Sequence, residues 1–425
     1  MKRILAGLGL PLLLAAPAFA APTAWVQYNT AGRAEARVVT DGACPSLKVD
    51  GKRLRTRERA AATEAFANRI CSATLPRAAK RASLAGVKLP LAKARPQRLV
   101  ILGDTGCRVK GPVVQNCNDP VAGWPFARIA ALAAAQKPDL VIHVGDYYYR
   151  ETPCPAGKEA ACGGGPYGDR WETWKAEWFD PAAPLLAAAP IVLARGNHED
   201  CKRGGLGWFR LLDASTKARA CPEASDTFAV ELGGTRLVVL DSADAVDEKA
   251  DPDQVAAFGA RLDVMKALQG KAPGQGKAPG QGREPAWLVT HRPVWFAFRA
   301  GPKLVDGVTN ASERAAANTR DLTGVQMVVA GHVHNFTSLD FGPTRPAQLI
   351  VGTGGDLLNG EPATSMSGSL AIDGLEAATY TMDPFGYLVL DRAGKDWVGA
   401  FHDLTDKVVA TCRLHDRSLH CEDAK

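Results

Sequence analysis

The chain has 425 residues, of which 46% are hydrophobic and 23% are charged, values that are ordinary for a globular protein. They exclude a collagen-like, a largely disordered or a multi-span membrane protein, and the length allows one to three domains. Eight histidines are few, so their positions carry information. Ten cysteines are many for a cytosolic protein and need an explanation.

Residues 1–20 have the pattern of a secretory signal peptide. Lys2 and Arg3 precede an apolar stretch, and Ala18-Phe19-Ala20 is a cleavage signal before residue 21. The alternative is an uncleaved anchor, but Gly and Pro interrupt the apolar run, and no later segment has the roughly 18 apolar residues of a membrane span. The sequence therefore predicts a periplasmic or secreted protein with no membrane attachment after cleavage.

Export makes disulfides the expected state of the cysteines. Sequence alone does not fix their connectivity. Pairing in chain order, however, gives separations of 8 to 27 residues, whereas successive pairs lie at least 36 residues apart. The predicted disulfides are therefore local: Cys44–Cys71, Cys107–Cys117, Cys154–Cys162, Cys201–Cys221 and Cys412–Cys421.

Residues 21–97 are predicted to form a small, basic, β-rich N-terminal domain. Short apolar runs alternate with turns, with one helical stretch near 58–70, and residues 21–98 hold 16 Lys or Arg and 5 Asp or Glu. A basic segment can contact nucleic acid or an anionic surface. Because no aromatic residues interrupt the basic run 52–59, we interpret it as a solvated face and expect no nucleic-acid partner.

Residues 98–425 are predicted to form a second, larger domain of the α/β class. Apolar strands without polar alternation indicate a sheet buried on both faces. Helical stretches separate these strands, at 124–136, 170–179 and 252–268. The Gly-Lys-Ala-Pro-Gly-Gln repeat within 270–282 indicates a surface insertion. From residue 386 onward, four strand-like runs predict a C-terminal β meander.

Metal-binding residue types follow five of the predicted strands. The blocks read Gly-Asp-Thr-Gly at 103–106, Gly-Asp-Tyr-Tyr-Tyr at 145–149, Gly-Asn-His-Glu at 196–199, Leu-Val-Thr-His at 288–291 and Gly-His-Val-His at 331–334. One such block carries little information, whereas five in order are not expected by chance. Carboxylate, amide and imidazole together suit Fe, Zn or Mn rather than thiolate chemistry. Two such ions form the clamp used for in-line attack on phosphorus.

These five blocks resemble those of the calcineurin-like metallophosphoesterases and, within them, the purple acid phosphatases. The resemblance covers about residues 98–356 and implies a four-layer αββα sandwich, here preceded by the small β-rich domain. Many relatives have Asp-x-His in the first block, where this chain has Thr105-Gly106. Tyr149, three residues after Asp146, would replace the missing histidine as a ligand, so the number of ligands stays the same. Leu288 stands where the family has Val, a change confined to a buried strand residue.

The resemblance implies two metal ions bridged by Asp146. It assigns Asp104, Asp146, Tyr149 and His334 to metal 1, and Asp146, Asn197, His291 and His332 to metal 2. Because a phenolate is a hard anionic donor, Tyr149 favours Fe(III) at metal 1, with Fe, Zn or Mn at metal 2. The other interpretation of Tyr149 is a structural tyrosine.

Three further residues are expected around this centre. His198 would bind phosphate and protonate the leaving oxygen. Glu199 would orient a ligating or catalytic histidine from behind, and His143 would be a core or supporting residue. Three predicted disulfides follow the blocks that end at Gly106, Tyr149 and Glu199, so we expect them to hold the rim of the site.

The resemblance therefore implies an exported acid phosphatase that hydrolyses small phosphomonoesters by attack of a metal-bound hydroxide. A phosphodiesterase or nucleotide pyrophosphatase on the same metal centre is the alternative, because the motifs do not separate these activities. A non-catalytic surface-binding protein is disfavoured because no expected ligand is missing. The sequence leaves the oligomeric state open.

Overall fold

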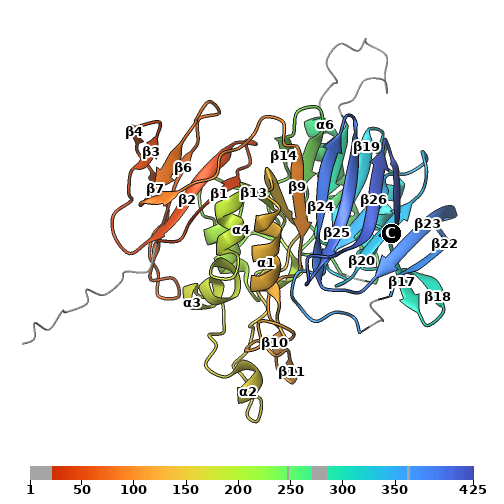
Figure 1. Ribbon diagram of the computed structural model, residues 1–425, viewed down its shortest axis with the longest axis horizontal. Coiled ribbons are helices and arrows are strands. Elements are labelled where there is room, and N and C mark those ends of the chain that lie inside the picture. Colours follow the sequence, from red (N-terminus) through yellow and green to blue (C-terminus); the bar gives the residue numbers. More distant parts are fainter. Residues whose placement is uncertain (1–21, 247, 270–284, 361–363) are drawn as a thin grey trace, which may run out of the picture.

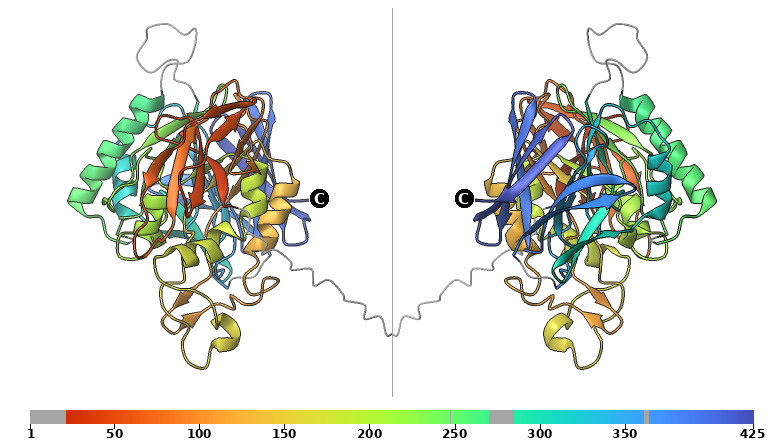
Figure 2. Two further views of the ribbon diagram at one scale, coloured as in Figure 1. Left: turned by 90° about the vertical axis from the view of Figure 1, so that its left-hand side faces the viewer. Right: turned by 90° about the vertical axis from the view of Figure 1, so that its right-hand side faces the viewer.

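Two large β-sheets pack face to face, and helices cover both outer faces (Figures 1 and 2). The computed structural model describes residues 22–246, 248–269, 285–360 and 364–425. The predicted signal peptide and the repeat at 270–282 lie outside the described residues. The four layers confirm the predicted αββα sandwich.

The first sheet has eleven strands, and its centre is parallel. Across the sheet the order is β27 (Ser418–Asp423), β26 (Val408–His415), β25 (Asp396–Asp403), β24 (Gly386–Ala393), β9 (Arg98–Leu102), β12 (Leu140–His143), β13 (Ile191–Leu193), β1 (Ala24–Tyr28), β2 (Ala34–Thr40), β6 (Arg69–Thr74) and β5 (Arg57–Ala60). β9, β12, β13 and β1 run parallel, which places the carboxyl ends of β9, β12 and β13 at one edge. The predicted C-terminal meander is confirmed as β24–β27.

The second sheet has eight strands and a parallel centre of its own. Its order is β14 (Phe228–Glu231), β15 (Arg236–Val239), β16 (Ala286–Val289), β19 (Val325–Ala330), β21 (Ala347–Val351), β20 (Phe336–Asp340), β23 (Leu375–Met382) and β22 (Met366–Ile372). β15, β16, β19 and β21 are parallel. Of the five sequence blocks with metal-binding residues, three therefore follow strands of the first sheet and two follow strands of the second.

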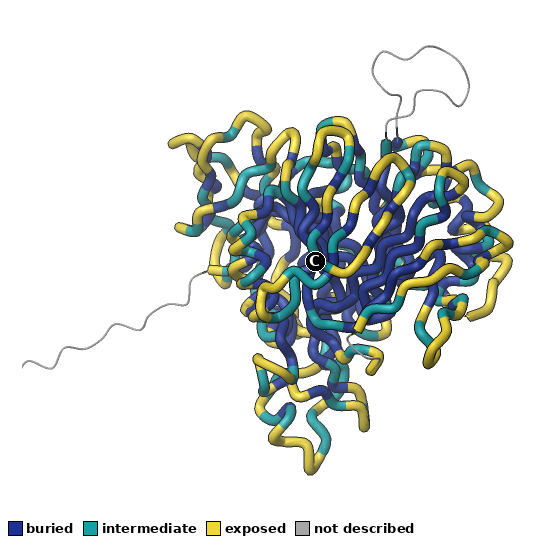
Figure 3. Tube along the Cα trace, turned by 45° about the vertical axis from the view of Figure 1, so that its right-hand side comes forward, coloured by how far each residue is buried: buried dark blue, intermediate teal, exposed yellow. Residues whose placement is uncertain are grey.

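The central strands of both sheets are buried, as their dark blue colour in Figure 3 shows. Three layers of apolar side chains pack against the two sheets. The middle layer lies between the sheets and joins side chains such as Ile101 and Val289. The outer layers are covered by α1 (Phe126–Ala135), α3 (Trp171–Trp174) and α4 (Ala183–Ala188) on one side, and by α6 (Pro252–Gln269) and α7 (Ala311–Asn318) on the other. Burial on both faces explains why these strands lack polar alternation.

The N-terminal segment is β-rich, as predicted, but half of its strands continue the first sheet. β1 pairs with β13, and β2, β6 and β5 extend the same sheet outward. The remaining strands, β3 (Leu47–Val49), β4 (Lys52–Leu54), β7 (Ala82–Leu84) and β8 (Val87–Lys88), form a small sheet. Separation of this segment as a domain ending at residue 97 stays a prediction.

The helical stretch predicted near 58–70 is wrong. Residues 57–60 form β5, which pairs with β6, and a turn joins the two strands. The Arg59 guanidinium donates hydrogen bonds to the backbone carbonyls of Phe209, Arg210 and Asp213. These tertiary contacts fix an extended conformation and override the local helical preference.

All five predicted disulfides are confirmed: Cys44–Cys71, Cys107–Cys117, Cys154–Cys162, Cys201–Cys221 and Cys412–Cys421. Cys107–Cys117 spans the hairpin of β10 (Val109–Lys110) and β11 (Val113–Val114), and Cys154–Cys162 reaches α2 (Glu159–Cys162), both in a lobe that projects below the sheets (Figure 1). Within the described parts of the chain, no helix is long and apolar enough to cross a membrane.

Candidate metal centre

The five blocks converge at one end of the two sheets, so that all seven predicted ligands lie in one cluster. Two overlapping groups form within it, Asp104, Asp146 and His334, and Asp146, His291 and His332. Within each group the possible ligand atoms lie within 4.8 Å of one another. Asp146 belongs to both groups, which is the position that a bridging carboxylate requires.

Tyr149 joins the first group through its phenol oxygen. This Oη atom lies 2.8 Å from Asp146 Oδ2, 3.2 Å from His334 Nε2 and 3.5 Å from Asp104 Oδ1. Burial and the neighbouring carboxylates raise the pKa of the phenol well above its ordinary value. A cation among these oxygens would oppose that effect, because positive charge favours the phenolate.

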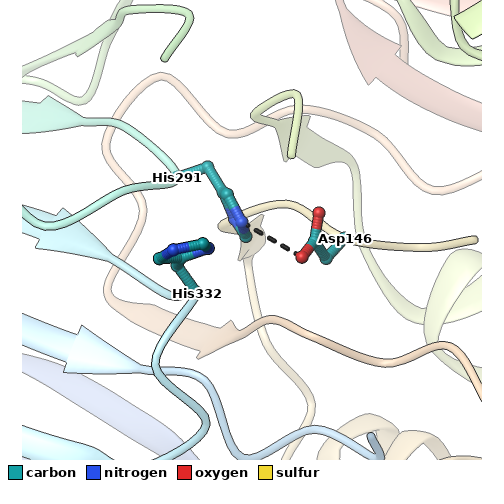
Figure 4. Close-up of side chains that lie close together, drawn as sticks. All are labelled: Asp146, His291 and His332. Atoms are coloured by element: carbon teal, nitrogen blue, oxygen red, sulfur yellow. Dashed lines mark ion pairs between the residues drawn. The ribbon is translucent and has the colours of Figure 1, made fainter. Parts of the chain in front are cut away.

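Asn197 joins the second group through its amide oxygen. Its Oδ1 lies 3.0 Å from His291 Nε2, and the same nitrogen lies 3.1 Å from Asp146 Oδ2 (Figure 4). The imidazole of His332 faces this pair in Figure 4. Its Nε2 also lies 3.2 Å from the Arg292 guanidinium, and burial, reinforced by this cation, holds the pKa of His332 well below its ordinary value.

Hydrogen bonds behind the imidazoles fix their tautomers. His291 Nδ1 lies 2.8 Å from the carbonyl oxygen of Val144, and His334 Nδ1 lies 2.6 Å from that of Leu357. A carbonyl accepts only, so each Nδ1 carries the hydrogen and each Nε2 is left to ligate. Although burial opposes the shift, Asp146 raises the pKa of His291 to about 9, and Asp356 and Asp104 raise the pKa of His334 to about 9. Each Nε2 would therefore release its proton when it binds a metal ion.

Four of the predicted ligands have a left-handed backbone conformation. The φ angles are 58° at Asp104, 60° at Asp146, 74° at His332 and 47° at His334. Non-glycine residues seldom adopt this left-handed region, and it persists at sites where function repays the cost. Close packing adds a second constraint, because a Cβ atom at Gly196 would lie 2.0 Å from Asp146 Oδ1.

Glu199 does not orient a histidine, so the predicted role is wrong. Its carboxylate accepts backbone N–H groups from Asp146, Tyr147, Tyr148 and Gly196 at 2.8–3.1 Å. Burial and the charge of Asp146 raise the pKa of Glu199 to about 8. Its function in the fold is to hold the Asp146 loop in its strained conformation.

Glu177 holds the Tyr149 loop in the same way and was not predicted. Its carboxylate accepts N–H groups from Cys107, Tyr149 and Arg150. A π-helical turn, Lys175–Phe179, continues α3 and carries this buried side chain. Such turns recur at functional sites. Glu177 follows no strand, so no pattern in the sequence marked it.

His198 has an acidic partner, which is Glu151. The Nδ1 atom of His198 lies 2.6 Å from Glu151 Oε1, and its backbone N–H donates to Asp146 Oδ1 at 2.9 Å. The ring lies against that of Tyr149, with centroids 3.8 Å apart. Burial lowers the pKa of His198, whereas Asp146 and Glu151 oppose this. The only sequence signal for Glu151 is its place two residues after the second block.

His143 lies behind the centre rather than in it. It is fully buried, its Nε2 lies 3.0 Å from Thr105 Oγ1, and its Nδ1 accepts the N–H of Gly145. A buried aspartate that was not predicted, Asp356, lies 3.5 Å from His334 Nε2. It follows β21 in the run Gly354-Gly355-Asp356, which is the strand-end signal that could have identified it.

Three arginines surround the cluster. Arg108 pairs with Asp356 and lies 4.8 Å over the Tyr149 ring. Arg203 lies 3.6 Å from Glu151, and Arg292 contacts His332. These cations offset the buried carboxylates and make the mouth of the site attractive to an anion.

Comparison with known proteins identifies the family. The family model for calcineurin-like phosphoesterases matches residues 97–336, more than half of the chain. The chain belongs to this family, and the site is that of a metal-dependent phosphoesterase. No curated protein sequence matches the chain.

The solved structures similar to the chain include PhoD and Vps29 from Entamoeba histolytica. The structure of PhoD is 11% identical, with a TM-score of 0.54 over 96% of this chain and 94% of that chain, and it supports the fold. The zinc complex of Vps29 from Entamoeba histolytica is 10% identical, with a TM-score of 0.28 over 77% of this chain and 98% of that chain. That score is too low to support a comparison.

The donor set fits two metal ions. Three buried carboxylates, from Asp104, Asp146 and Asp356, face imidazole nitrogens and a phenol within hydrogen-bonding range. Buried anionic groups at this density need compensating positive charge. Oxygen and imidazole donors without thiolate suit Fe, Zn or Mn.

Proposed function

We propose that the protein is an exported phosphatase that hydrolyses small phosphomonoesters, with Fe(III) at metal 1 and Fe, Zn or Mn at metal 2. The observation that carries this proposal is the position of Tyr149 Oη among Asp104, Asp146 and His334. A phenolate is a hard, anionic donor and therefore favours a trivalent ion. Five disulfides support export to an oxidising compartment.

The bound metal ions would supply an activated water and neutralise charge on the phosphoryl group. The residues of the chain have separate tasks. His198, paired with Glu151, is placed to donate a proton to the leaving oxygen of the alcohol. Glu199 and Glu177 hold the loop that carries Asp146 and Tyr149, so these ligands need not reorganise during the reaction. The mechanism requires no phosphorylated residue.

The arginine rim supports a phosphomonoester rather than a diester. A monoester carries up to two negative charges near neutral pH, whereas a diester carries one. Arg108, Arg203 and Arg292 lie around the centre, and the first two also pair with Asp356, Asp200 and Glu151. The two bound metal ions would add the positive charge that, together with these arginines, favours the dianion.

Two measurements on the purified protein test this function. Aryl phosphate is expected to have a higher kcat/KM than bis-aryl phosphate, and the reverse order would establish the diesterase alternative. Metal analysis is expected to find iron, with a visible absorption band from the iron–tyrosinate pair. A colourless, iron-free and active enzyme would remove the iron assignment and keep the family. Cell fractionation of the full-length chain tests export.

A further inference from the structure

A pocket of about 400 Å³ lies beside the predicted metal ligand His332. Its walls come from β17 (Phe296–Ala300), from the loop after β19 and from the end of β23. Phe296, Phe298, Val333 and Met382 form the apolar side of the pocket, and polar residues such as Arg299, Asn335 and Asp383 line the rest. His332 lines this pocket and belongs to the second ligand group, so the pocket and the candidate metal centre share one wall.

Two phenylalanines form a flat aromatic wall on one side of the pocket. Phe296 and Phe298 are alternate residues of β17 and so face the same way. Their rings are stacked, with centroids 5.8 Å apart and planes 25° apart. Gly307 lies opposite Phe296 on β18 (Lys303–Gly307), and a Cβ atom there would lie 2.5 Å from the Phe296 ring. The glycine therefore leaves the room that the ring occupies.

Packing holds the Phe296 ring in place, whereas the Phe298 ring is partly exposed to solvent. Phe296 is buried and packs with Val333 and Ile350 in a small apolar cluster. Phe298 remains 36% exposed. A bound apolar group that covered this ring would remove its surface from water and gain the corresponding stabilisation. The wall is therefore pre-formed for a flat apolar ligand.

We propose that this pocket binds the organic group of the substrate, and that the preferred substrates are phosphomonoesters of flat, apolar, aryl-type alcohols. The proposal rests on the proposed phosphatase function. The phosphate would lie at the metal centre, and the ester oxygen would lead past His332 onto the Phe298 ring. The volume is within the range of small-molecule sites. A small hydrophilic alcohol would contact neither phenylalanine.

Binding of two non-hydrolysable phosphonates tests the pocket without turnover. Calorimetry on the metal-loaded mature protein would compare 1-naphthylphosphonate with methylphosphonate. The wild type is expected to bind the naphthyl compound at least about tenfold more tightly. Phe298→Ala is expected to reduce that ratio about fivefold or more and to leave methylphosphonate binding unchanged. This variant removes one ring contact of Phe296 and keeps its packing against Val333 and Ile350.

Lys303→Ala is the matched control, since Lys303 is an exposed residue of the same hairpin that does not line the pocket. It should keep the wild-type ratio. Equal affinities for the two phosphonates, or an unchanged ratio in Phe298→Ala, would overturn the proposal. Preferential binding without hydrolysis of any monoester would contradict the phosphatase function and keep the pocket. Hydrolysis of monoesters without preferential binding of the naphthyl compound would support the phosphatase function and contradict the pocket proposal.

Discussion

The ring of Tyr149 occupies the space that a side chain at Gly106 would take. A Cβ atom at residue 106 would lie 2.4 Å from Tyr149 Cδ2 and 2.8 Å from Glu177 Oε1. A histidine at 106 and a tyrosine ring in this position therefore exclude each other. The missing histidine of the first block and the added phenol of the second block are two consequences of one packing constraint.

Gly106→Ala is expected to displace the Tyr149 ring and to lower the iron content of the purified protein. Overpacking of this kind costs about 1–3 kcal/mol of folding stability. Tyr149→Phe keeps the ring and removes only Oη, so it should abolish the visible band with little loss of stability. Gly42→Ala is the control, because its Cβ would meet nothing closer than 4.0 Å. Wild-type iron content in Gly106→Ala would contradict the packing argument.

His198→Ala is expected to slow hydrolysis of alkyl phosphates more than that of nitrophenyl phosphate. An alkoxide needs a proton to depart, whereas nitrophenolate is a stable leaving group. General acids of this type contribute about 10²–10⁴-fold. Steady-state kinetics on both substrates would measure the difference. Equal losses would indicate a role in binding rather than in proton donation.

Glu151→Gln is expected to reproduce part of the His198 effect with the same dependence on the leaving group. The carboxylate lies 2.6 Å from His198 Nδ1, so its charge stabilises the protonated imidazole and fixes the ring. We expect a loss in kcat of about tenfold, smaller than that of the general acid itself. Glu172→Gln, a change at an exposed residue of α3, should leave kcat unchanged. A loss confined to KM would refute the positioning role.

The sequence predicted the strands, the disulfides and the seven candidate ligands because each leaves a local signal. Apolar runs ending in Gly-Asp or Gly-His place the ligands at the strand ends, and short cysteine spacings favour local pairs. The supporting carboxylates leave no such signal. Glu177 sits in a tryptophan-rich helix, and Glu151 lies in a loop, so only the folded chain brings them to Tyr149 and His198.

Local sequence patterns also do not predict which strands pair when they are far apart in the chain. The contact of β1 with β13 makes the N-terminal strands part of the first sheet, although the two strands are far apart in sequence. The sequence presents Arg59 as one more basic residue of an exposed run, yet its side chain is buried against the π-helical turn Trp208–Leu212 and against Asp213. The basic character of this segment is therefore only partly a surface property.

Removing the Cys201–Cys221 disulfide as a Ser/Ser pair is expected to lower both stability and activity. A loop of this length is worth about 3 kcal/mol in the unfolded-chain model. The bridge begins two residues after Glu199 and encloses Arg203, so its loss frees a segment of the rim. Removal of Cys412–Cys421, which joins β26 to β27, should lower the thermal midpoint and leave kcat/KM unchanged. Unchanged activity and metal content in the first variant would contradict the rim role.

Glu313 is a buried titratable residue outside the metal centre, and it makes the stability of the protein depend on pH. It is fully buried at the start of α7, where Asn310 Nδ2 donates to its carboxylate at 2.7 Å. Burial raises its pKa to about 8, although Arg261 opposes the shift. The folded pKa exceeds the unfolded value of about 4.3, so the neutral acid is favoured in the folded state. This contribution to stability is complete below the unfolded pKa and is lost as pH rises through 8.

Glu313→Gln should therefore gain stability relative to the wild type as pH rises from 5 to 9. Glutamine keeps the shape and the acceptor of the side chain and carries no charge at any pH. Thermal midpoints of both proteins at pH 5, 7 and 9 give the difference directly, and other titrating groups cancel because both chains share them. Glu64→Gln, at an exposed residue of the N-terminal segment, should show no such trend. A difference between wild type and Glu313→Gln that stays constant across this range would mean that Glu313 is already ionised at pH 5 in the folded protein.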